Sequence, residues 1–222
     1  MNIRGYCLSK VNGPGLRFVL WTQGCSKGCK NCFNPETWSN DIYKEYSPRQ
    51  IFELIKNFEL EGVTISGGDP LEQEDDLLEL LFLLKEIKLP KGIILFTGFS
   101  RNEIRENPIR EKCLEYIDVL IDGRYEEEFK TEDSLRGSSN QEFYFFSDKI
   151  SRDELFFDQE IELSLVDDNI VMTTWEHFQG SEFLIASTSN FAFQEGFQKL
   201  QRPQPPLRHC LPHRLRLPAC CW

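Results

Sequence analysis

Short apolar runs alternate with helical segments along most of this chain, and this alternation constrains the fold more than any other feature. The runs that predict strands are 16–22, 62–66, 93–96 and 117–122. The segments with helical spacing are 48 to about 60, 72–88, and 101–116 with a break near Pro108. Strands that alternate with helices pair in parallel through right-handed crossovers. We therefore expect an α/β fold, a partial (incomplete) β/α barrel with a mostly parallel sheet, followed by an irregular C-terminal extension.

Three cysteines, Cys25, Cys29 and Cys32, lie just after the first of these strands. Their spacing lets one tight loop direct three thiolates at a single centre, and it supplies no fourth protein ligand. This arrangement suits an iron–sulfur cluster that keeps one iron open for chemistry. The loop follows the carboxyl end of a strand, where ligands and cofactors gather in parallel α/β sheets. The motif therefore favours a reactive cofactor.

A structural zinc site is the alternative interpretation of the same thiolates. Such a site normally closes its shell with four Cys or His ligands. No second pair of closely spaced ligands follows in this sequence. The fourth ligand would have to be Cys7 in a predicted strand, Cys113 on the buried face of a predicted helix, or the distant His177. The spacing alone leaves both interpretations open, with the cluster favoured.

A glycine turn, Gly67-Gly68-Asp69-Pro70, follows the strand at 62–66. Because glycine has no Cβ, a bound group can approach this backbone closely. Asp69 stands where the next helix begins, and a carboxylate there interacts favourably with the helix dipole. An ordinary strand-to-helix turn has the same pattern. Beside the cysteine loop, the pattern favours a turn that holds the polar end of a cofactor.

Several ordered motifs together resemble one known family. The segments with the resemblance are 12–18, 25–32, 33–38 and 67–70. They resemble the radical S-adenosylmethionine activating enzymes of glycyl radical enzymes. Within that group, the segments 97–99, 118–123 and 135–141 look most like the activating enzymes of anaerobic ribonucleoside-triphosphate reductases. The resemblance runs from about residue 3 to residue 174.

The resemblance implies one 4Fe–4S cluster ligated by Cys25, Cys29 and Cys32, whose fourth iron is chelated by S-adenosylmethionine. The residues that it assigns to cofactor binding are Phe33, Gly67, Gly68 and Asp69, the last three at the methionine end. In many radical S-adenosylmethionine enzymes the residue before the third cysteine is aromatic and lies beside the adenine. Here that residue is Asn31, and Phe33 follows the cysteine instead, as in the reductase-activating branch.

The resemblance also implies an enzyme, a radical S-adenosylmethionine oxidoreductase. Reductive cleavage of S-adenosylmethionine would give a 5′-deoxyadenosyl radical that removes a Cα hydrogen from a glycine of an anaerobic ribonucleoside-triphosphate reductase. The implied partners are that reductase and a low-potential electron donor such as flavodoxin or ferredoxin. Two alternatives stay open: a radical S-adenosylmethionine enzyme that acts on another peptide or a small molecule, and a non-catalytic metal-binding or electron-transfer module.

Charge and hydropathy exclude some classes of partner. The formal net charge is −11, and residues 1–196 contain 20 basic and 36 acidic groups, a net charge of −16. Surfaces that bind nucleic acid need clustered positive charge, so we expect no nucleic-acid partner. No apolar run is long enough to span a bilayer, and no signal-peptide pattern is present. We expect a cytoplasmic protein with no membrane partner and with reduced cysteines.

The chain divides by composition. We expect 1–174 to form the radical S-adenosylmethionine domain, with a hairpin between residues 161 and 174, and 175–222 to form a poorly defined extension. Within it, 201–222 holds five of the eleven prolines and three of the eight cysteines, which predicts disorder. A basic docking arm or a metal site are the other interpretations. The candidate metal ligands are His209, Cys210, His213 and Cys220 or Cys221.

The polar segment from Arg136 to Asn140, before a predicted strand at 142–146, has two equal interpretations. It is either a loop that caps the site or meets the reductase, or an ordinary solvated turn. We interpret Asp118 and Asp122 as cap and turn residues, because they stand at the start and end of a predicted strand. The mechanism that the resemblance implies requires no catalytic base.

Overall fold

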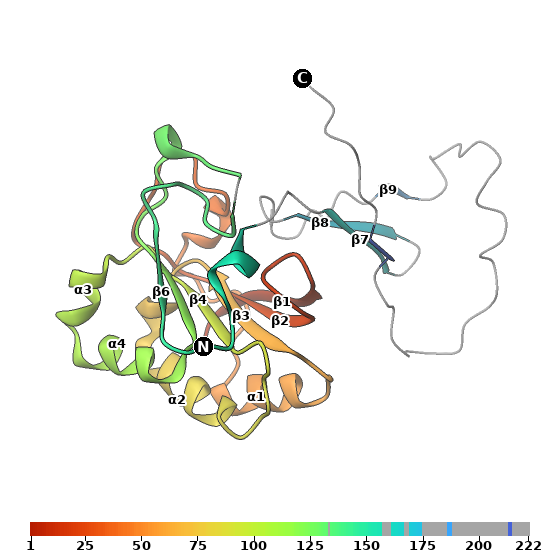
Figure 1. Cartoon of the computed structure of the whole chain (residues 1–222), viewed down its shortest axis with the longest axis horizontal. Helices are drawn as coiled ribbons and strands as arrows, with labels where there is room; N and C mark the ends of the chain where they lie inside the picture. The colour runs from red at the N-terminus through yellow and green to blue at the C-terminus, as the bar shows by residue number, and fades with distance from the viewer. Residues whose placement is uncertain (133, 157–160, 167–168, 175–185, 188–212, 215–222) are drawn as a thin grey trace, which may run out of the picture.

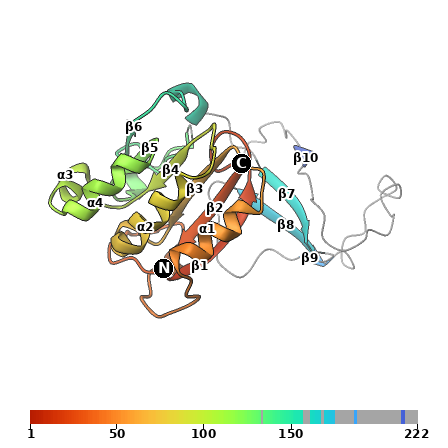
Figure 2. The same ribbon diagram turned by 90° about the horizontal axis from the view of Figure 1, so that it is seen from below.

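A computed structural model describes residues 1–132, 134–156, 161–166, 169–174, 186–187 and 213–214. Its main body is a sheet whose helices lie along one face (Figure 1), and the view from below places α1 and α2 over that same face (Figure 2). The sheet has six strands in the order β1-β2-β3-β4-β5-β6. Their bounds are Ile3–Ser9, Arg17–Thr22, Gly62–Gly67, Ile93–Phe96, Val119–Asp122 and Glu142–Phe145.

The pairing of these strands confirms the α/β class and the mostly parallel sheet. Strands β2, β3, β4 and β5 pair in parallel, and β1 and β6 add antiparallel edges. The register places Trp21 beside Ser66 and Ile65 beside Leu95. The sheet is open, with β1 and β6 as its edges, as an incomplete barrel requires.

The helices occupy the predicted positions but are shorter than predicted. Their bounds are Pro48–Lys56 for α1, Glu74–Leu84 for α2, Arg101–Arg105 for α3 and Pro108–Cys113 for α4. The first ends at Lys56, before the predicted residue 60, and the predicted helix 72–88 is the 3-10 helix η2 (Pro70–Gln73) followed by α2. Asn107 explains the break between α3 and α4, because its side chain caps a new helix that starts at Pro108.

Alternate residues of the parallel strands face opposite sides of the sheet. Leu20, Ile65 and Leu95 are fully buried in the core that the strands share with α1, α2 and α4. Burying one such side chain stabilises the fold by about 1.5–3 kcal/mol. Trp21 and Phe96, one position further along their strands, line a pocket instead. The face of the sheet without helices is therefore the face that holds the site.

Arg17 is fully buried at the amino end of β2. Its Nε donates to Thr64 Oγ1 at 2.6 Å. Its two Nη atoms donate to the carbonyl oxygens of Pro14, Val63, Lys91 and Gly92 at 2.7 to 3.0 Å. Burial lowers the pKa of Arg17 to about 9, which leaves the guanidinium charged at neutral pH. One side chain thus joins the loop before β2 to the beginnings of β3 and β4.

A second sheet has the order β10-β7-β8-β9. Its strands are Ile161–Val166 (β7), Asn169–Thr174 (β8), Ala186–Ser187 (β9) and His213–Arg214 (β10). The antiparallel pairing of β7 with β8 confirms the predicted hairpin. Of the tail residues named as possible metal ligands, His213 is in β10 and the others lie outside the described residues, so the tail and the domain division stay predictions. In the described part of the chain, no helix is long and apolar enough to cross a membrane.

Candidate active site

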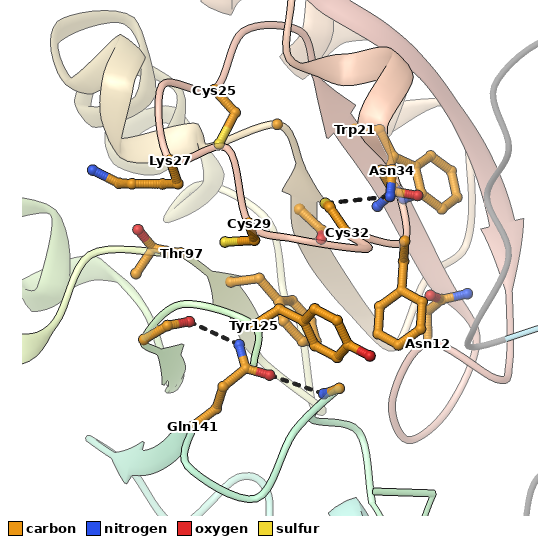
Figure 3. Close-up of a pocket in the computed structure, with 17 residues that line it drawn as sticks. Asn12, Trp21, Cys25, Lys27, Cys29, Cys32, Asn34, Thr97, Tyr125 and Gln141 are labelled. Carbon is orange, nitrogen blue, oxygen red and sulfur yellow. Dashed lines mark hydrogen bonds between the residues drawn. The ribbon is translucent and has the colours of Figure 1, made fainter. Parts of the chain in front are cut away.

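A pocket opens at the carboxyl ends of β2, β3, β4 and β5 (Figure 3). Its empty space, including the part open to solvent, is about 910 Å³. The loop after β2 brings Cys25, Cys29 and Cys32 to one side of it, and Gly68 and Gly98 come from the turns after β3 and β4. The parallel topology thus collects at one edge residues that are far apart in sequence.

The cysteine loop has a defined backbone conformation. The N–H of Cys25 donates to Trp38 O at 3.2 Å, and the N–H of Cys32 donates to Cys29 O at 3.1 Å. Asn31 has a φ of 54°, the left-handed region that asparagine tolerates better than most residues. This turn redirects the chain between the second and third cysteines, so that all three side chains line the pocket.

Two glutamates from other elements hold this loop. The Glu72 carboxylate, in η2, accepts the backbone N–H of Ser26 at 2.9 Å and its hydroxyl at 2.5 Å. The Lys27 ammonium lies 3.9 Å from the same carboxylate. On the other side, the Asn31 amide donates to the carboxylate of Glu127, in the 3-10 helix η4 (Glu127–Phe129). The loop is therefore fastened at both its ends.

The surroundings of Cys25 and Cys29 disfavour the thiolate form and so raise the pKa of both thiols. Burial raises the pKa of Cys25 to about 12, and the carboxylates of Asp69 and Glu72 add to the shift. Burial also raises the pKa of Cys29. Metal ligation requires thiolates, so a bound cation would have to replace these protons.

The positions of the thiols bear on whether the site suits a cluster or a single ion. Ligands of one zinc ion lie about 2.0–2.3 Å from it, so their donor atoms lie within about 4.6 Å of one another. Among the described residues, the group whose donor atoms lie within 4.8 Å of one another is Cys25, Asp69 and Glu72, without Cys29 or Cys32. Cys25, Cys29 and Cys32 do not form such a group, which favours a multi-iron cluster, because the thiolates of a cluster bind different irons.

No described Cys or His completes a zinc site with these thiols. Cys7 is in β1 and Cys113 is buried in α4, and neither lines the pocket. His177, the third candidate, lies outside the described residues. The described pocket supplies three thiols and no fourth Cys or His, which is the donor set of a cluster with one open iron.

Gly67 and Gly68, at the end of β3, allow the backbone there to pack closely against the end of β2 and the residues that follow it. Gly67 has a φ of 107°, and a Cβ there would lie 2.3 Å from Thr22 N. A Cβ on Gly68 would lie 2.2 Å from Gly24 O. The Gly68 N–H donates to Thr22 O at 2.9 Å, and the Asp69 N–H donates to Gly24 O at 2.8 Å. These amides hold the start of the cysteine loop, and Gly68 also lines the pocket.

Asp69 lies behind the pocket wall and is fully buried. Its Oδ1 accepts from Thr97 Oγ1 at 2.8 Å and from Leu71 N at 3.1 Å, and its Oδ2 accepts from Gly98 N at 3.0 Å. It therefore caps η2 and also connects the turn after β3 to the turn after β4. Thr97 and Gly98 reach the pocket, while Asp69 does not line it.

Phe33 does line the pocket, in contact with Tyr125 from the loop after β5. Their ring centroids lie 4.6 Å apart. Asn31, in contrast, is exposed and turned toward Glu127. The aromatic surface of this pocket thus comes from the residue after the third cysteine and from a distant loop.

Comparison with known proteins identifies the relatives of this chain. Residues 11–144 match the model of the family described as a 4Fe-4S single cluster domain. An anaerobic ribonucleoside-triphosphate reductase-activating protein from Enterobacteria phage T4 is 33% identical over 152 residues, 66% of this chain and 95% of the relative. This chain belongs to the family of anaerobic ribonucleoside-triphosphate reductase-activating proteins. The protein of that name from Pasteurella multocida is 35% identical over 155 residues, 65% of this chain and 97% of the relative. That from Escherichia coli K12 is 31% identical over 144 residues, 61% and 92%.

Membership of the activating-protein family confirms the resemblance and the class of enzyme. The members are radical S-adenosylmethionine enzymes, and the cofactors are one 4Fe–4S cluster and S-adenosylmethionine. The roles assigned to individual residues stay predictions. The structure brings Cys25, Cys29, Cys32, Phe33 and Gly68 into one pocket, and it places Gly67 and Asp69 just behind its wall.

Sequence reasoning missed other residues of the pocket in this activating protein. Asn12, Lys27 and Tyr125 line it but were not selected as site residues. The last could have been found from its place directly after a predicted parallel strand, because the carboxyl ends of such strands meet at one edge. Asn12 begins the segment 12–18 that carries part of the resemblance, and it reaches the pocket from the loop that Arg17 anchors.

Proposed function

We propose that this protein uses its cluster and S-adenosylmethionine to install a glycyl radical on an anaerobic ribonucleoside-triphosphate reductase. The observation that carries the proposal is the pocket itself, where three thiols stand together with no fourth Cys or His among the described lining residues. When bound there, the cofactors supply reductive cleavage of a sulfonium and a 5′-deoxyadenosyl radical that takes a Cα hydrogen from glycine. The protein binds and orients the reacting groups and excludes water.

Cys25, Cys29 and Cys32 would hold the three protein-ligated irons. Protein contacts to Glu72 and Glu127 hold their loop from both sides, which reduces the ordering that ligation requires. S-adenosylmethionine would bind in the open part of the pocket beside these thiols. Gly68 and Gly98 border that space without side chains, so a polar group can approach their backbone closely.

Of the remaining assigned residues, one would contact S-adenosylmethionine directly and two would act on it through the residues that line the pocket. Phe33, with Tyr125, offers an apolar surface for the nucleoside. Asp69 would act on the methionine end through Thr97 and Gly98, whose positions it sets by accepting their hydrogen bonds. Gly67 would act indirectly: because it has no Cβ, the end of β3 can pack closely against the end of β2. In this assignment Asp69 is a positioning residue.

The partners are part of the proposal. The curated relatives are named for a reductase that they activate, and we infer the same partner for this chain. The electron would come from a low-potential donor such as flavodoxin or ferredoxin. Such donors and a reduced thiol set suit a cytoplasmic location.

The deciding experiment measures 5′-deoxyadenosine and glycyl radical together. Anaerobically reconstituted protein is reduced with dithionite, and S-adenosylmethionine is added with and without the anaerobic reductase encoded in the same genome. The variants compared are Cys29→Ala and Cys113→Ala. Cys113 is a matched control because it is a buried thiol in α4 that does not line the pocket.

We expect 5′-deoxyadenosine and a glycyl radical signal from the wild type and from Cys113→Ala, and neither from Cys29→Ala. Cleavage with no radical on the reductase would leave the chemistry intact but disprove this substrate, in favour of another peptide or a small molecule. Full iron content with no cleavage would disprove radical chemistry and favour an electron-transfer module.

A further inference from the structure

Lys27, in the cysteine loop between Cys25 and Cys29, is the only charged residue among the described residues that line the pocket. Its side chain is only 8% exposed. Figure 3 shows its ammonium group directed away from Cys29 and Cys32. Lys27 is none of the residues assigned to the cofactors, although a cation that is almost buried needs compensating contacts.

The turn after β4 holds the Lys27 side chain in place. The ammonium nitrogen lies 3.1 Å from the centroid of the Phe99 ring, and Phe99 is itself buried. A cation over the face of an aromatic ring is attracted by the ring quadrupole. A Cβ on Gly98 would lie 2.9 Å from Lys27 Cγ, so the aliphatic part of the side chain packs where glycine leaves space. These contacts fix the charge at one place beside the cysteine loop.

Negative charge gathers on the side of Cys25 that faces η2. The Cys25 sulfur and one carboxylate oxygen each of Asp69 and Glu72 lie within 4.8 Å of one another. Burial is the largest cause of the raised pKa of Cys25, and these two carboxylates add to it. A thiolate at this position would be a third negative charge in a small, partly buried volume, where like charges repel more strongly than in water. A positive charge nearby would offset part of this repulsion.

Lys27 supplies a positive charge at this place. Its Nζ lies 3.9 Å from Glu72 Oε1. Its charge also acts on Asp69: burial raises the pKa of Asp69, and Lys27 is one of the groups that counter the rise. The same ammonium therefore interacts with both carboxylates that lie beside the Cys25 sulfur.

The other cations near the site have more contact with water. Arg110 approaches the same aromatic ring as Lys27 but does not line the pocket, and its side chain is 20% exposed. The Arg124 side chain is 54% exposed. Lys30, in the cysteine loop itself, is exposed as well. Water and salt screen exposed charges, so of these four cations Lys27 is the least screened.

A reduced cluster places still more negative charge at this position. One-electron reduction of the bound cluster by the low-potential donor adds one negative charge among the thiolates. The reduction potential of such a cluster depends on nearby charge, on hydrogen bonds to the sulfurs and on exposure to solvent. A buried cation stabilises the more negative, reduced form, whereas neighbouring carboxylates disfavour it.

We propose that Lys27 supplies a fixed positive charge that offsets Asp69 and Glu72 and makes the cluster easier to reduce. This inference rests on the proposed function, because it requires a cluster on Cys25, and it adds the residue that adjusts the reduction potential. In this role Lys27 ligates no iron and transfers no proton. The shift of the potential should follow the sign of each charge that is changed, which a role in folding alone would not produce.

The test measures the reduction midpoint of the reconstituted cluster, without S-adenosylmethionine or reductase, in a redox titration followed by absorption and EPR. Lys27→Met removes the charge at similar length, and Lys27→Arg keeps it. Glu72→Gln removes the opposing charge, keeps an acceptor for Ser26, and tests the sign of the effect even if Lys27→Met holds no cluster. Lys30→Met is the matched control, because it removes one positive charge from an exposed position of the same loop. Iron and sulfide per protein, with urea denaturation of the iron-free proteins, show which variants are folded and loaded.

At the wild-type midpoint potential, we expect the ratio of reduced to oxidised cluster to fall about tenfold in Lys27→Met, a shift of about 59 mV for one electron. Lys27→Arg should recover most of this ratio. Glu72→Gln should raise the ratio, because it removes a negative charge beside Cys25. Lys30→Met should change the ratio by less than about twofold, because its charge is exposed and screened.

Four results would overturn the inference, and the first three would leave the proposed function standing. A wild-type midpoint in Lys27→Met would show that this charge does not act on the cluster, and weaker binding of S-adenosylmethionine in that variant would assign the charge to the cofactor carboxylate instead. Equal shifts in Lys27→Met and Lys30→Met would show only an effect of net charge. Shifts of the same sign in Lys27→Met and Glu72→Gln would show a loosened loop. Wild-type protein that holds no 4Fe–4S cluster would remove the proposed function, and this inference with it.

Discussion

The Asp69 carboxylate accepts the Thr97 hydroxyl at 2.8 Å across the turns that end two adjacent parallel strands. Its other oxygen accepts the Gly98 N–H at 3.0 Å, and none of its surface is exposed. An aspartate that the sequence places at the start of a helix is thus also the connection between two walls of the pocket. Its substitution should lower the free energy of unfolding and also weaken cofactor binding.

Asp69→Asn should destabilise the iron-free protein by about 1–3 kcal/mol. The amide nitrogen that replaces one oxygen is a donor, so one hydrogen bond to Thr97, Leu71 or Gly98 is lost and a buried group is left unpaired. Urea denaturation of the iron-free protein measures the free energy of unfolding. Asp75→Asn, at an exposed position of α2, is the control and should change it by less than about 0.5 kcal/mol.

The same carboxylate predicts a pH dependence of stability. Burial raises the pKa of Asp69 to about 6, from its ordinary value of 3.8, despite the hydrogen bonds from Thr97 and Gly98. Between these two values the folded state binds more protons than the unfolded state. The contribution to the free energy of unfolding is therefore full below pH 3.8 and decreases as the pH rises toward 6, by up to about 1.4 kcal/mol per pH unit. Asp69→Asn should remove this slope, and an unchanged slope in that variant would contradict the assignment.

The fold was predictable because its signals are local and repeated. The runs of Val, Ile, Leu and Phe marked β2 to β5, and the Ser47 capping box marked the start of α1. The helix ends were less predictable, because apolar residues such as Ile87 and Leu89 continue the pattern beyond Leu84. These residues pack against the core from a turn, so composition alone does not show where the helix stops.

The site was predictable only where a motif is contiguous. Cys25, Cys29 and Cys32 lie within eight residues and give their own signal. The contact of Phe33 with Tyr125 joins residues that are 92 positions apart, and it depends on how far the sheet curves. The buried position of Asp69 likewise depends on the turn after β4. Neither relationship follows from spacing, because each is a property of tertiary packing.

Arg17→Met should destabilise the protein by about 3–5 kcal/mol. The change leaves the Thr64 hydroxyl and four backbone carbonyls without the donor that they share, at a position with no access to water. Arg49→Met on the exposed face of α1 is the matched control, and it should cost less than about 1 kcal/mol. The two variants are compared by urea denaturation of the iron-free protein, and equal losses would show that the hydrogen bonds of Arg17 add nothing.

Glu72→Ala should speed the release of iron from the site, although Glu72 is not itself one of the proposed cluster ligands. The Glu72 carboxylate accepts both the N–H and the hydroxyl of Ser26, the residue next to Cys25. Hydrogen bonds to a charged group contribute about 1.5–3 kcal/mol each, so their loss lets the cysteine loop open more often. We expect the reconstituted variant to hold its iron but to release it to a chelator at least about tenfold faster than wild type.

The control for this prediction is Glu79→Ala, which removes an exposed carboxylate of α2 and changes the net charge by the same amount. Iron release from this control should match the wild type. If both variants release iron equally fast, the effect of Glu72 is only one of charge. If Glu72→Ala releases iron no faster than wild type, the other contacts of the loop, through Trp38 and Glu127, are sufficient to hold it closed.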